Sequence, residues 1–331
     1  MTSRQLFDIQ LQPVSGSRFQ PTGFPDIGTA LFKRPVTVDG VTTWQDAVMI
    51  ESAQSMANRL EGAAWDAGAD SPNPVLAGLP YVRVVDTNDN YLTSSRTEAH
   101  RLASAFVKDA TFGDQDMRVV IKERLGLQDN RPLSYRDIAE AVFKLDPMCL
   151  IHGVFFAEAA SVWPGQPKIL RAVTATIEAY DVHRADSGGV KRDHVMHSLG
   201  DKEKTGGTAE GYGTVPFHRT EWTAAEILAM FSIDLAQLDS YGLPGPATAL
   251  LLAIARWEIR SLLDAGLRLR TACDLEPCSA VLVDRAGDQL PSGSDLATTI
   301  EELTAQCGDL LGAGAPMEVV WAPGAKGKRA S

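Results

Sequence analysis

Apolar and polar positions repeat with two different periods along this chain, which predicts both strands and helices. Phe7, Ile9 and Leu11 alternate with Asp8 and Gln10, the period of a half-buried strand. In a second segment, apolar residues recur at helical spacing, namely Met49, Ala53, Met56, Leu60 and Ala64. This second pattern predicts an amphipathic helix over residues 51–64.

Further elements follow from the same patterns and from helix start and stop signals. Helices are predicted at residues 95–107, 135–145, 224–231, 247–265 and 295–307. Ser134 is the expected cap of the second of these helices, and Thr223 with Glu226 forms a capping box for the third. Strands are predicted at residues 149–156, 171–179, 267–270 and 317–321. The chain is therefore expected to be an α+β protein.

Composition is that of an ordinary globular protein. The chain has 331 residues, 44% hydrophobic and 22% charged, which fits one or two domains. No apolar run reaches 18 residues and the first eight residues do not resemble a signal peptide, so we expect a cytoplasmic protein without a membrane span. The four cysteines form no C-x-x-C pair, which favours free buried thiols over a zinc site.

The formal net charge of −11 limits the kinds of partner that the chain can bind. Affinity for nucleic acid comes largely from Lys and Arg contacts to phosphate. An acidic protein can still carry a local basic groove, but its whole surface is not expected to attract phosphate. Any RNA contact must therefore be confined to a narrow stripe.

Several short segments carry groups suited to holding single-stranded RNA. Residues 16–28 contain three glycines and two prolines, which forbid a regular element, and place Arg18, Phe19 and Gln20 side by side. The 51–64 helix shows Gln54, Ser55, Asn58 and Arg59 away from its apolar face, although an ordinary polar face explains this equally well. Glycines and cations also gather between residues 181 and 216, and Arg268 and Arg270 share one strand face. Single-stranded RNA is held by side chains that stack on its bases, by cations along its phosphates and by backbone N–H groups that approach the phosphates closely.

Catalytic signatures are weak by comparison. The chain has no Walker loop, Rossmann fingerprint, H-E-x-x-H motif or nucleophile elbow. Asp193, His194 and His197 could form a metal-dependent hydrolase site, but the surrounding glycines argue against the helix that would bring them together. His183, His194 or His218 could serve metal-free acid–base chemistry on RNA, and the spacing singles out none of them. We expect His152 to be a hydrogen-bonded core residue.

Six segments, in order along the chain, are similar to motifs of one protein family. They are Gly16-Ser-Arg-Phe-Gln-Pro-Thr-Gly-Phe-Pro-Asp-Ile-Gly28, Ile50-Glu-Ser-Ala-Gln-Ser-Met-Ala-Asn-Arg-Leu-Glu61, Ser94-Ser-Arg-Thr-Glu-Ala-His-Arg-Leu102, Ile151-His-Gly-Val-Phe-Phe156, Ser187-Gly-Gly-Val-Lys191 and Gly266-Leu-Arg-Leu-Arg-Thr-Ala-Cys-Asp-Leu275. Together they resemble the backbone subunits of type I-G (formerly I-U) CRISPR effector complexes, within the repeat-associated RNA-binding (RAMP) superfamily.

The resemblance implies an RRM-like (ferredoxin-like) palm with large insertions that form a thumb and fingers. It implies a structural subunit, not an enzyme, that lines up in several copies along a CRISPR guide RNA in a Cascade-type antiviral complex. The guide would then pair with invading DNA. Expected partners are further copies, a large subunit, a repeat-processing subunit and a helicase-nuclease, with no membrane and no cofactor. A metal-independent endoribonuclease that processes the guide RNA remains the alternative.

The resemblance also implies positions for the RNA contacts and the insertions. Candidate fingers span residues 66–147, the candidate thumb lies within residues 183–216, and residues 323–331 form a flexible basic tail. The candidate RNA-binding residues lie in the first loop, the first helix, the glycine-rich turn and the late strand: Arg18, Phe19, Gln20, Ser52, Gln54, Ser55, Asn58, Arg59, Ser187, Gly188, Gly189, Lys191, Arg268 and Arg270.

Overall fold

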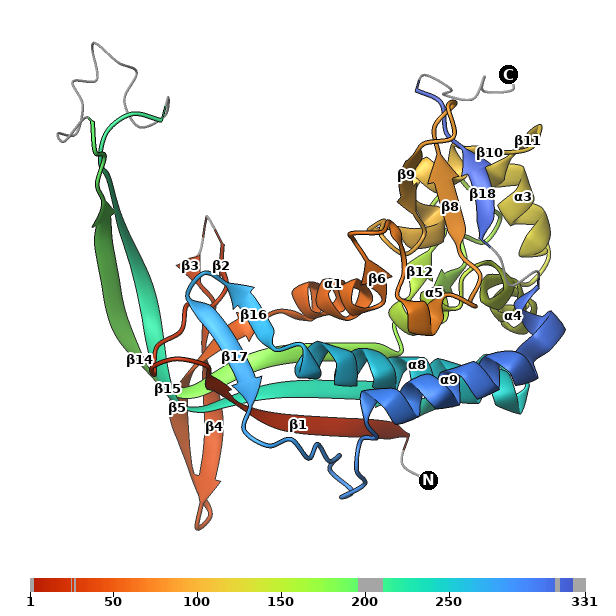
Figure 1. The fold of residues 1–331 in the computed structure, drawn as a ribbon. Helices are drawn as coiled ribbons and strands as arrows, with labels where there is room; N and C mark the ends of the chain where they lie inside the picture. Colours follow the sequence, from red (N-terminus) through yellow and green to blue (C-terminus); the bar gives the residue numbers. More distant parts are fainter. Residues whose placement is uncertain (1–2, 25, 27, 196–210, 313–315, 324–331) are drawn as a thin grey trace.

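A seven-stranded antiparallel sheet forms the centre of the molecule (Figure 1). The structure is a computed structural model that describes residues 3–24, 26, 28–195, 211–312 and 316–323. In spatial order the strands of this sheet are β16 (Leu267–Arg270), β17 (Cys273–Pro277), β1 (Arg4–Pro13), β15 (Val215–Asp234), β14 (Val173–Lys191), β5 (Val41–Glu51) and β4 (Leu31–Val38).

The middle of this sheet has the ferredoxin-like arrangement expected for an RRM-like core. Along the chain, β1 is followed by helix α1 (Ala53–Ala63), the β14–β15 hairpin, helix α8 (Gly245–Asp264) and β17. In space these four strands lie in the order β17-β1-β15-β14. This is a β-α-β-β-α-β unit whose first strand lies between the third and the fourth. The α+β prediction with an RRM-like core is confirmed.

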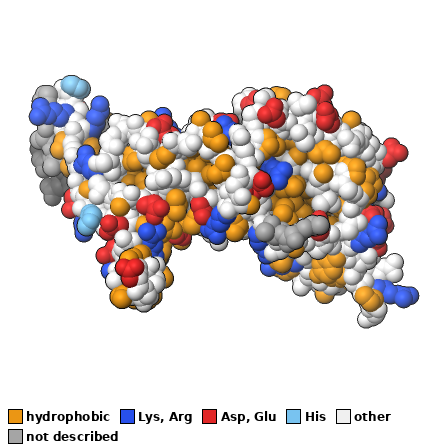
Figure 2. Space-filling view, turned by 90° about the horizontal axis from the view of Figure 1, so that it is seen from below, with side chains coloured by type: hydrophobic (Ala, Val, Ile, Leu, Met, Phe, Trp, Pro, Cys, Tyr) orange, Lys and Arg blue, Asp and Glu red, His pale blue; other side chains and the backbone are white. Residues whose placement is uncertain are grey.

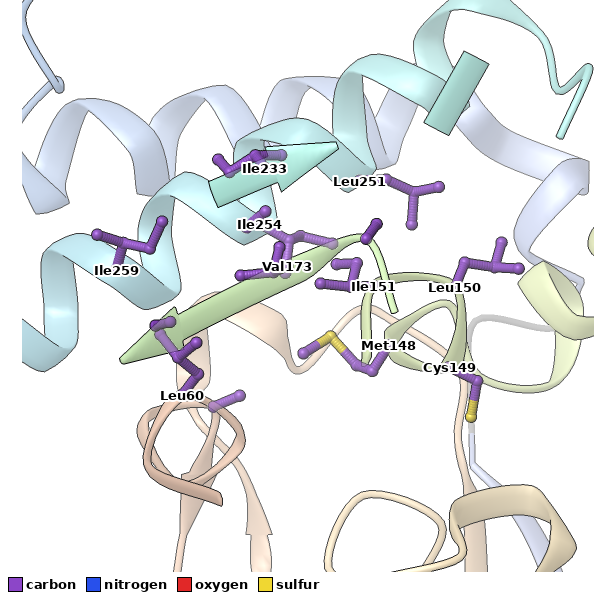
Figure 3. Close-up of a cluster of buried hydrophobic side chains, with 14 of the residues drawn as sticks. Leu60, Met148, Cys149, Leu150, Ile151, Val173, Ile233, Leu251, Ile254 and Ile259 are labelled. Carbon is purple, nitrogen blue, oxygen red and sulfur yellow. The ribbon is translucent and has the colours of Figure 1, made fainter. Parts of the chain in front are cut away.

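Helices cover one face of the sheet. In β1, Phe7, Ile9 and Leu11 are buried whereas Asp8 and Gln10 are exposed, so the two-residue period separates a covered face from an open one. Side chains from β14, β15, α1, α5 (Met148–His152) and α8 gather in one cluster on the covered side (Figure 3). Helices α7 (Leu235–Ser240) and α9 (Gly293–Cys307) complete the helical layer.

A second group of elements is formed mainly by the chain between α1 and β14, and is joined by the C-terminal strand β18. Its five-stranded sheet has the order β11-β10-β18-β8-β9, and β18 (Met317–Val320) lies parallel to β8 (Val82–Val85). The remaining strands and helices of this part are β9 (Tyr91–Ser94), β10 (Thr111–Phe112), β11 (Gln115–Asp116), α2 (Ala105–Lys108), α3 (Met117–Arg124) and α4 (Tyr135–Leu145). Short two-stranded pairs complete it, β6 (Trp65–Asp66) with β7 (Ser71–Pro72) and β12 (Val154–Phe155) with β13 (Lys168–Ile169). That residues 66–147 act as fingers stays a prediction.

Two hairpins extend beyond the body of the molecule (Figure 1). One consists of residues 183–195 and 211–223, which are the outer parts of β14 and β15 and the short segments that continue them, and is called here the outer hairpin. The other is formed by β4 and β5 around Asp39 and Gly40, both with positive φ, as in a type I′ turn. A further short pair joins β2 (Gly23–Phe24) to β3 (Gly28–Thr29).

The helix predicted at residues 224–231 is wrong, because this segment is part of β15. Its inward positions Ile227, Ala229 and Phe231 are buried at a period of two, and the strand pairs with both β1 and β14. The hydrogen bonds to two neighbouring strands therefore outweigh the helix start signal of the local capping box. Residues 183–191 and 215–216, which lie in the stretch where glycines and cations gather, also belong to these strands.

Two other local predictions fail for physical reasons. Residues 148–152 form helix α5 instead of a strand, and because all five are buried their pattern carries no period that tells the two apart. The helix expected at residues 95–107 is reduced to a 3-10 turn and α2, with Ser104 as the α2 cap. His152 is a core residue as predicted, with its Nε2 2.9 Å from Glu258 Oε1.

No helix in the described part of the chain is long and apolar enough to span a membrane.

Candidate nucleic-acid interface

Glu51, Arg59 and Arg270 meet where β5 passes into α1, and they are called here the inner cluster. Ser52 caps α1 and its side chain accepts a hydrogen bond from the Ser55 backbone N–H, so the helix begins at Ala53. Glu51 therefore lies at the end of β5, not in the predicted helix, and is only 1% exposed. Both arginines pair with Glu51 Oε1.

The two arginines also bind backbone carbonyls and so join separate segments. Arg59 Nη2 donates to Leu269 O at 2.9 Å, which links α1 to β16. Arg270 donates to Gln20 O at 2.9 Å and to Ile50 O at 3.2 Å, which links β16 to the first loop and to β5. The structure thus brings the Gln20 backbone, Arg59 and Arg270 together, and that these residues bind RNA stays a prediction. Arg270 thus uses both of its Nη atoms inside the protein, whereas Arg59 uses Nη2 there and its buried Nε has no acceptor among the described residues.

The first loop is fixed to the sheet by its backbone. Phe19 N–H donates to Trp222 O at 2.9 Å and Trp222 N–H donates to Phe19 O at 2.8 Å. Gln20 N–H donates to Ala272 O at 2.7 Å. The Phe19 ring is 1% exposed and belongs to the core, so the prediction that it is a free stacking surface is wrong. An aromatic side chain in a loop can pack into the hydrophobic core, and the Phe19 ring does so.

Arg18 connects the first loop to the base of the outer hairpin. Its side chain is half exposed, and its Nε lies 3.6 Å from Glu221 Oε2. Arg219 Nε approaches the other oxygen of the same carboxylate at 3.9 Å. Glu221 is largely buried and so holds two cations at one place on β15. The sequence analysis missed Glu51, Glu221 and Arg219, because a carboxylate in a strand gives no local signal of what it pairs with.

Ser187, Gly188, Gly189 and Lys191 lie in the outer part of β14. The prediction of a glycine-rich turn is wrong here, because these residues form ladder pairs with β15. Gly189 lies opposite Phe217, and a Cβ at Gly189 would be 2.9 Å from Phe217 Cζ, so the ring covers the bare backbone. An aromatic ring above a strand glycine stabilises a sheet that lacks a side chain. Lys191 is exposed.

Cations and histidines gather at this end of the molecule (Figure 2). Ser187 is the ladder partner of Arg219, and Gly188 is the partner of His218. The guanidinium of Arg219 lies 5.2 Å from the centre of the Phe217 ring. The outer hairpin therefore offers exposed positive charge and an exposed ring within a few residues. These are the two groups that hold single-stranded nucleic acid.

The remaining predicted residues lie on two surfaces near the inner cluster. Gln54 and Asn58 are exposed on α1, and Ser55 is half-buried beside them. Arg268 is exposed on β16, and a bulge separates it from Arg270. The predicted residues therefore follow a path from α1 through the inner cluster and Arg18 to the outer hairpin.

The metal hypothesis finds no support in the described residues. Within residues 3–195 and 211–323, as far as they are described, no three His, Cys, Asp or Glu side chains are grouped to hold a metal ion. The Asp193 carboxylate accepts hydrogen bonds from the backbone of Val195 and Gly213 instead. His197 lies outside the described residues, as does most of the predicted basic tail at 323–331.

Comparisons with known proteins give one sequence family. The sequence profile of the family described as CRISPR-associated protein GSU0053 matches residues 6–184, more than half of the chain. No curated protein matches the chain. A solved chain described as "CRISPR RNA-guided surveillance complex, pre-nicking" is 12% identical, covers 83% of this chain and 73% of its own, and has a TM-score of 0.34. That score is too low to support any functional argument. The family match itself is direct: this chain belongs to the CRISPR-associated protein GSU0053 family.

Proposed function

We propose that this chain is the guide-RNA-binding backbone subunit of a type I-G (formerly I-U) CRISPR effector complex. Membership of a CRISPR-associated family limits the biological setting. The observation that carries the proposal is the path from α1 through the inner cluster to the outer hairpin, with Arg18 and Arg219 on one carboxylate between them. In this proposal the path holds the guide RNA and the outer hairpin is the thumb.

A narrow path agrees with the charge of the protein. At a net charge of −11, the surface as a whole repels phosphate. Arg18, Lys191 and Arg268 are exposed along the path, and the inner arginines are fixed behind them. The subunit therefore binds a short length of RNA at a defined place, and does not coat itself with it.

Several copies lie along one guide in this proposal, and the β4–β5 hairpin supplies a surface for contacts between them. Val38, Val41 and Trp44 are 63%, 65% and 65% exposed at and near the hairpin end. Large apolar side chains grouped on a projecting hairpin mark a contact surface. β4 carries Lys33 and Pro35, which oppose pairing along its edge, so the contact is made by side chains.

Coexpression with guide RNA and the other complex subunits tests this proposal. The expected product is an RNA-bound assembly that contains several copies of this chain, measured by native mass spectrometry. Trp44→Ser should reduce the copy number, whereas Val119→Ser, at an exposed position of α3, should not. A chain that stays monomeric and free of RNA under these conditions would contradict the proposal.

The subunit is also proposed not to cut RNA. Its alternative role, as a metal-independent endoribonuclease, needs a histidine that can act as a base, and His194 is exposed on the outer hairpin. Incubation with repeat RNA in EDTA separates the two roles. Intact RNA is expected; cleavage at one site that disappears in His194→Ala would establish the nuclease instead.

A further inference from the structure

A hollow of about 260 Å³ lies at the C-terminal end of α1, next to the α1 end of the path described above. Its walls come from two segments, the end of α1 with β6 and the turn after β9. Asn58, Trp65, Arg96 and Thr97 are among the residues that line it. The volume is below the roughly 300–1,000 Å³ of sites for drug-sized ligands, so a smaller group would fill it.

Trp65 is held in a fixed orientation by two tyrosines. Its ring stacks on Tyr91, with centroids 6.1 Å apart and planes 25° apart. The edge of Tyr81 meets it at 5.9 Å and 82°. The guanidinium of Arg83 lies 4.9 Å from the centre of the Tyr91 ring. A half-buried aromatic ring supported in this way presents a flat surface that loses little entropy when a ligand stacks on it.

Two polar groups at the hollow have hydrogen-bonding capacity to spare. Among the described residues, the exposed Asn58 side chain has no hydrogen-bond partner. Arg96 is 3% exposed at its side chain; its Nη2 donates to Leu79 O and Pro80 O and its Nε lies 3.6 Å from Asp146, but Nη1 has no acceptor among the described residues. Because this nitrogen is itself buried, Arg96 forms part of the wall, and Asn58 is the group that a ligand in the hollow can reach.

The other polar residues of the hollow are already occupied. Glu61 accepts two hydrogen bonds from Arg101 at 2.6 and 2.8 Å, and Thr97 Oγ1 is bonded to the side chains of Thr93 and Ser94. The groups available to a ligand are therefore the Asn58 amide and the aromatic face of Trp65. This is the set that recognises an unstacked nucleobase, by its face and by its edge.

We propose that this hollow, called here the Trp65 pocket, takes one nucleobase of single-stranded RNA, stacked on Trp65 and contacted at its edge by Asn58. The proposal rests on the proposed function, because the RNA is the same molecule. Asn58 lies four residues after Gln54, on the same face of α1, so the predicted RNA-binding face leads directly to the pocket. A base held here fixes the position of the strand along α1.

Intact and abasic RNA separate stacking from phosphate binding. The binding of a fluorescent single-stranded RNA is compared with that of the same RNA lacking its bases, which keeps every phosphate. Stacking on an aromatic residue contributes about 1–3 kcal/mol per base, or roughly 5- to 150-fold in affinity. Wild-type protein should prefer intact RNA by at least about fivefold, and Trp65→Ala should lower binding of intact RNA while leaving abasic RNA unchanged.

Matched variants keep the outcome interpretable. Trp65→Phe retains a ring and should keep most of the preference for intact RNA, and Tyr135→Ala, at an exposed aromatic residue on α4, should keep all of it. Equal losses on both RNAs in Trp65→Ala would mean that the ring is only structural and would overturn the proposal. An unchanged preference for intact RNA in Trp65→Ala would also overturn the proposal. So would a Trp65→Ala protein that binds RNA normally but no longer binds its partner subunits, because the pocket would then take a protein side chain.

Wild-type protein that binds neither RNA would refute the proposed function together with the pocket. Wild-type protein that binds RNA, with the preference for bases unaffected by Trp65→Ala, would refute the pocket alone.

Discussion

The inner cluster and the outer hairpin carry the same kind of residue in opposite settings. In the inner cluster, Arg59 and Arg270 share one carboxylate that is 1% exposed, and they bind carbonyls of three segments. In the outer hairpin, Lys191 is exposed on the two-stranded ladder of β14 and β15. The first region is part of the fold, and the second extends from it.

This difference shows that a cation predicted to bind RNA can instead have a structural role. Removal of one partner from a buried ion pair leaves a desolvated charge, which costs several kcal/mol, whereas an exposed charge can be removed at almost no cost in stability. Loss of RNA binding on mutation therefore means different things in the two regions. Stability must be measured beside binding for every cation on the path.

The largest effect is expected for Glu51→Gln. Replacement of the shared carboxylate leaves two arginines facing each other without their counter-charge, and the free energy of unfolding should fall by about 3 kcal/mol. Urea denaturation followed by circular dichroism measures this change. Glu301→Gln, at an exposed position of α9, is the matched control and should stay within about 0.5 kcal/mol of wild type. An equally small change for Glu51→Gln would mean that the inner cluster is not part of the fold's stability.

Thiol reactivity gives the next effect and reports on the same region. Burial raises the pKa of the Cys273 thiol to about 12, against the opposing influence of Arg270, whereas Cys278 is exposed. Since the thiolate is the reactive form, iodoacetamide at pH 8 should modify Cys278 at least about tenfold faster than Cys273. Peptide mass spectrometry of timed samples follows both sites. In Glu51→Gln the Cys273 rate should rise; comparable rates in wild-type protein would show that the inner region opens freely.

The smallest effect, and the one that most directly contrasts the two regions, is expected for Lys191→Ala. If Lys191 contacts one phosphate, the salt dependence of RNA binding should fall by about 0.7 in log–log slope. The stability should change by no more than about 0.5 kcal/mol, because the side chain is exposed. Arg59→Ala is the counterpart in the inner cluster and should lower the stability as well. An unchanged slope for Lys191→Ala would remove that residue from the RNA path.

Elements with a long, clear period could be predicted from the sequence. The helices near residues 51–64, 135–145, 247–265 and 295–307 and the strands near residues 6–11, 267–270 and 317–321 were located to within a few residues. Errors arose where the period was lost or was opposed by a local signal. Residues 148–152 are buried on all sides, and the capping box at Thr223 and Glu226 lies inside a strand with partners on both sides.

The residues of the candidate site also fall into those that a local pattern predicts and those that it does not. Gln54 and Asn58 were identified because a helix period fixes which residues face outward, and this holds whatever the helix packs against. Phe19 was placed in the interface because a loop ring has no periodic neighbours that reveal its burial. Glu51, Glu221 and the Trp65 pocket depend on contacts between segments far apart in the chain, which no local pattern contains.

The sequence by itself determined the α+β class, most long elements, the acidic charge that confines any RNA contact, and the family resemblance. Only the tertiary structure decided which cations are bound internally, that residues 187–191 are strand and not turn, and that Trp65 lines a pocket. The physical reason is that periodicity records whether a side chain faces the core or the solvent. The partner of a buried charge or ring is set by how the sheet and helices bring distant segments together.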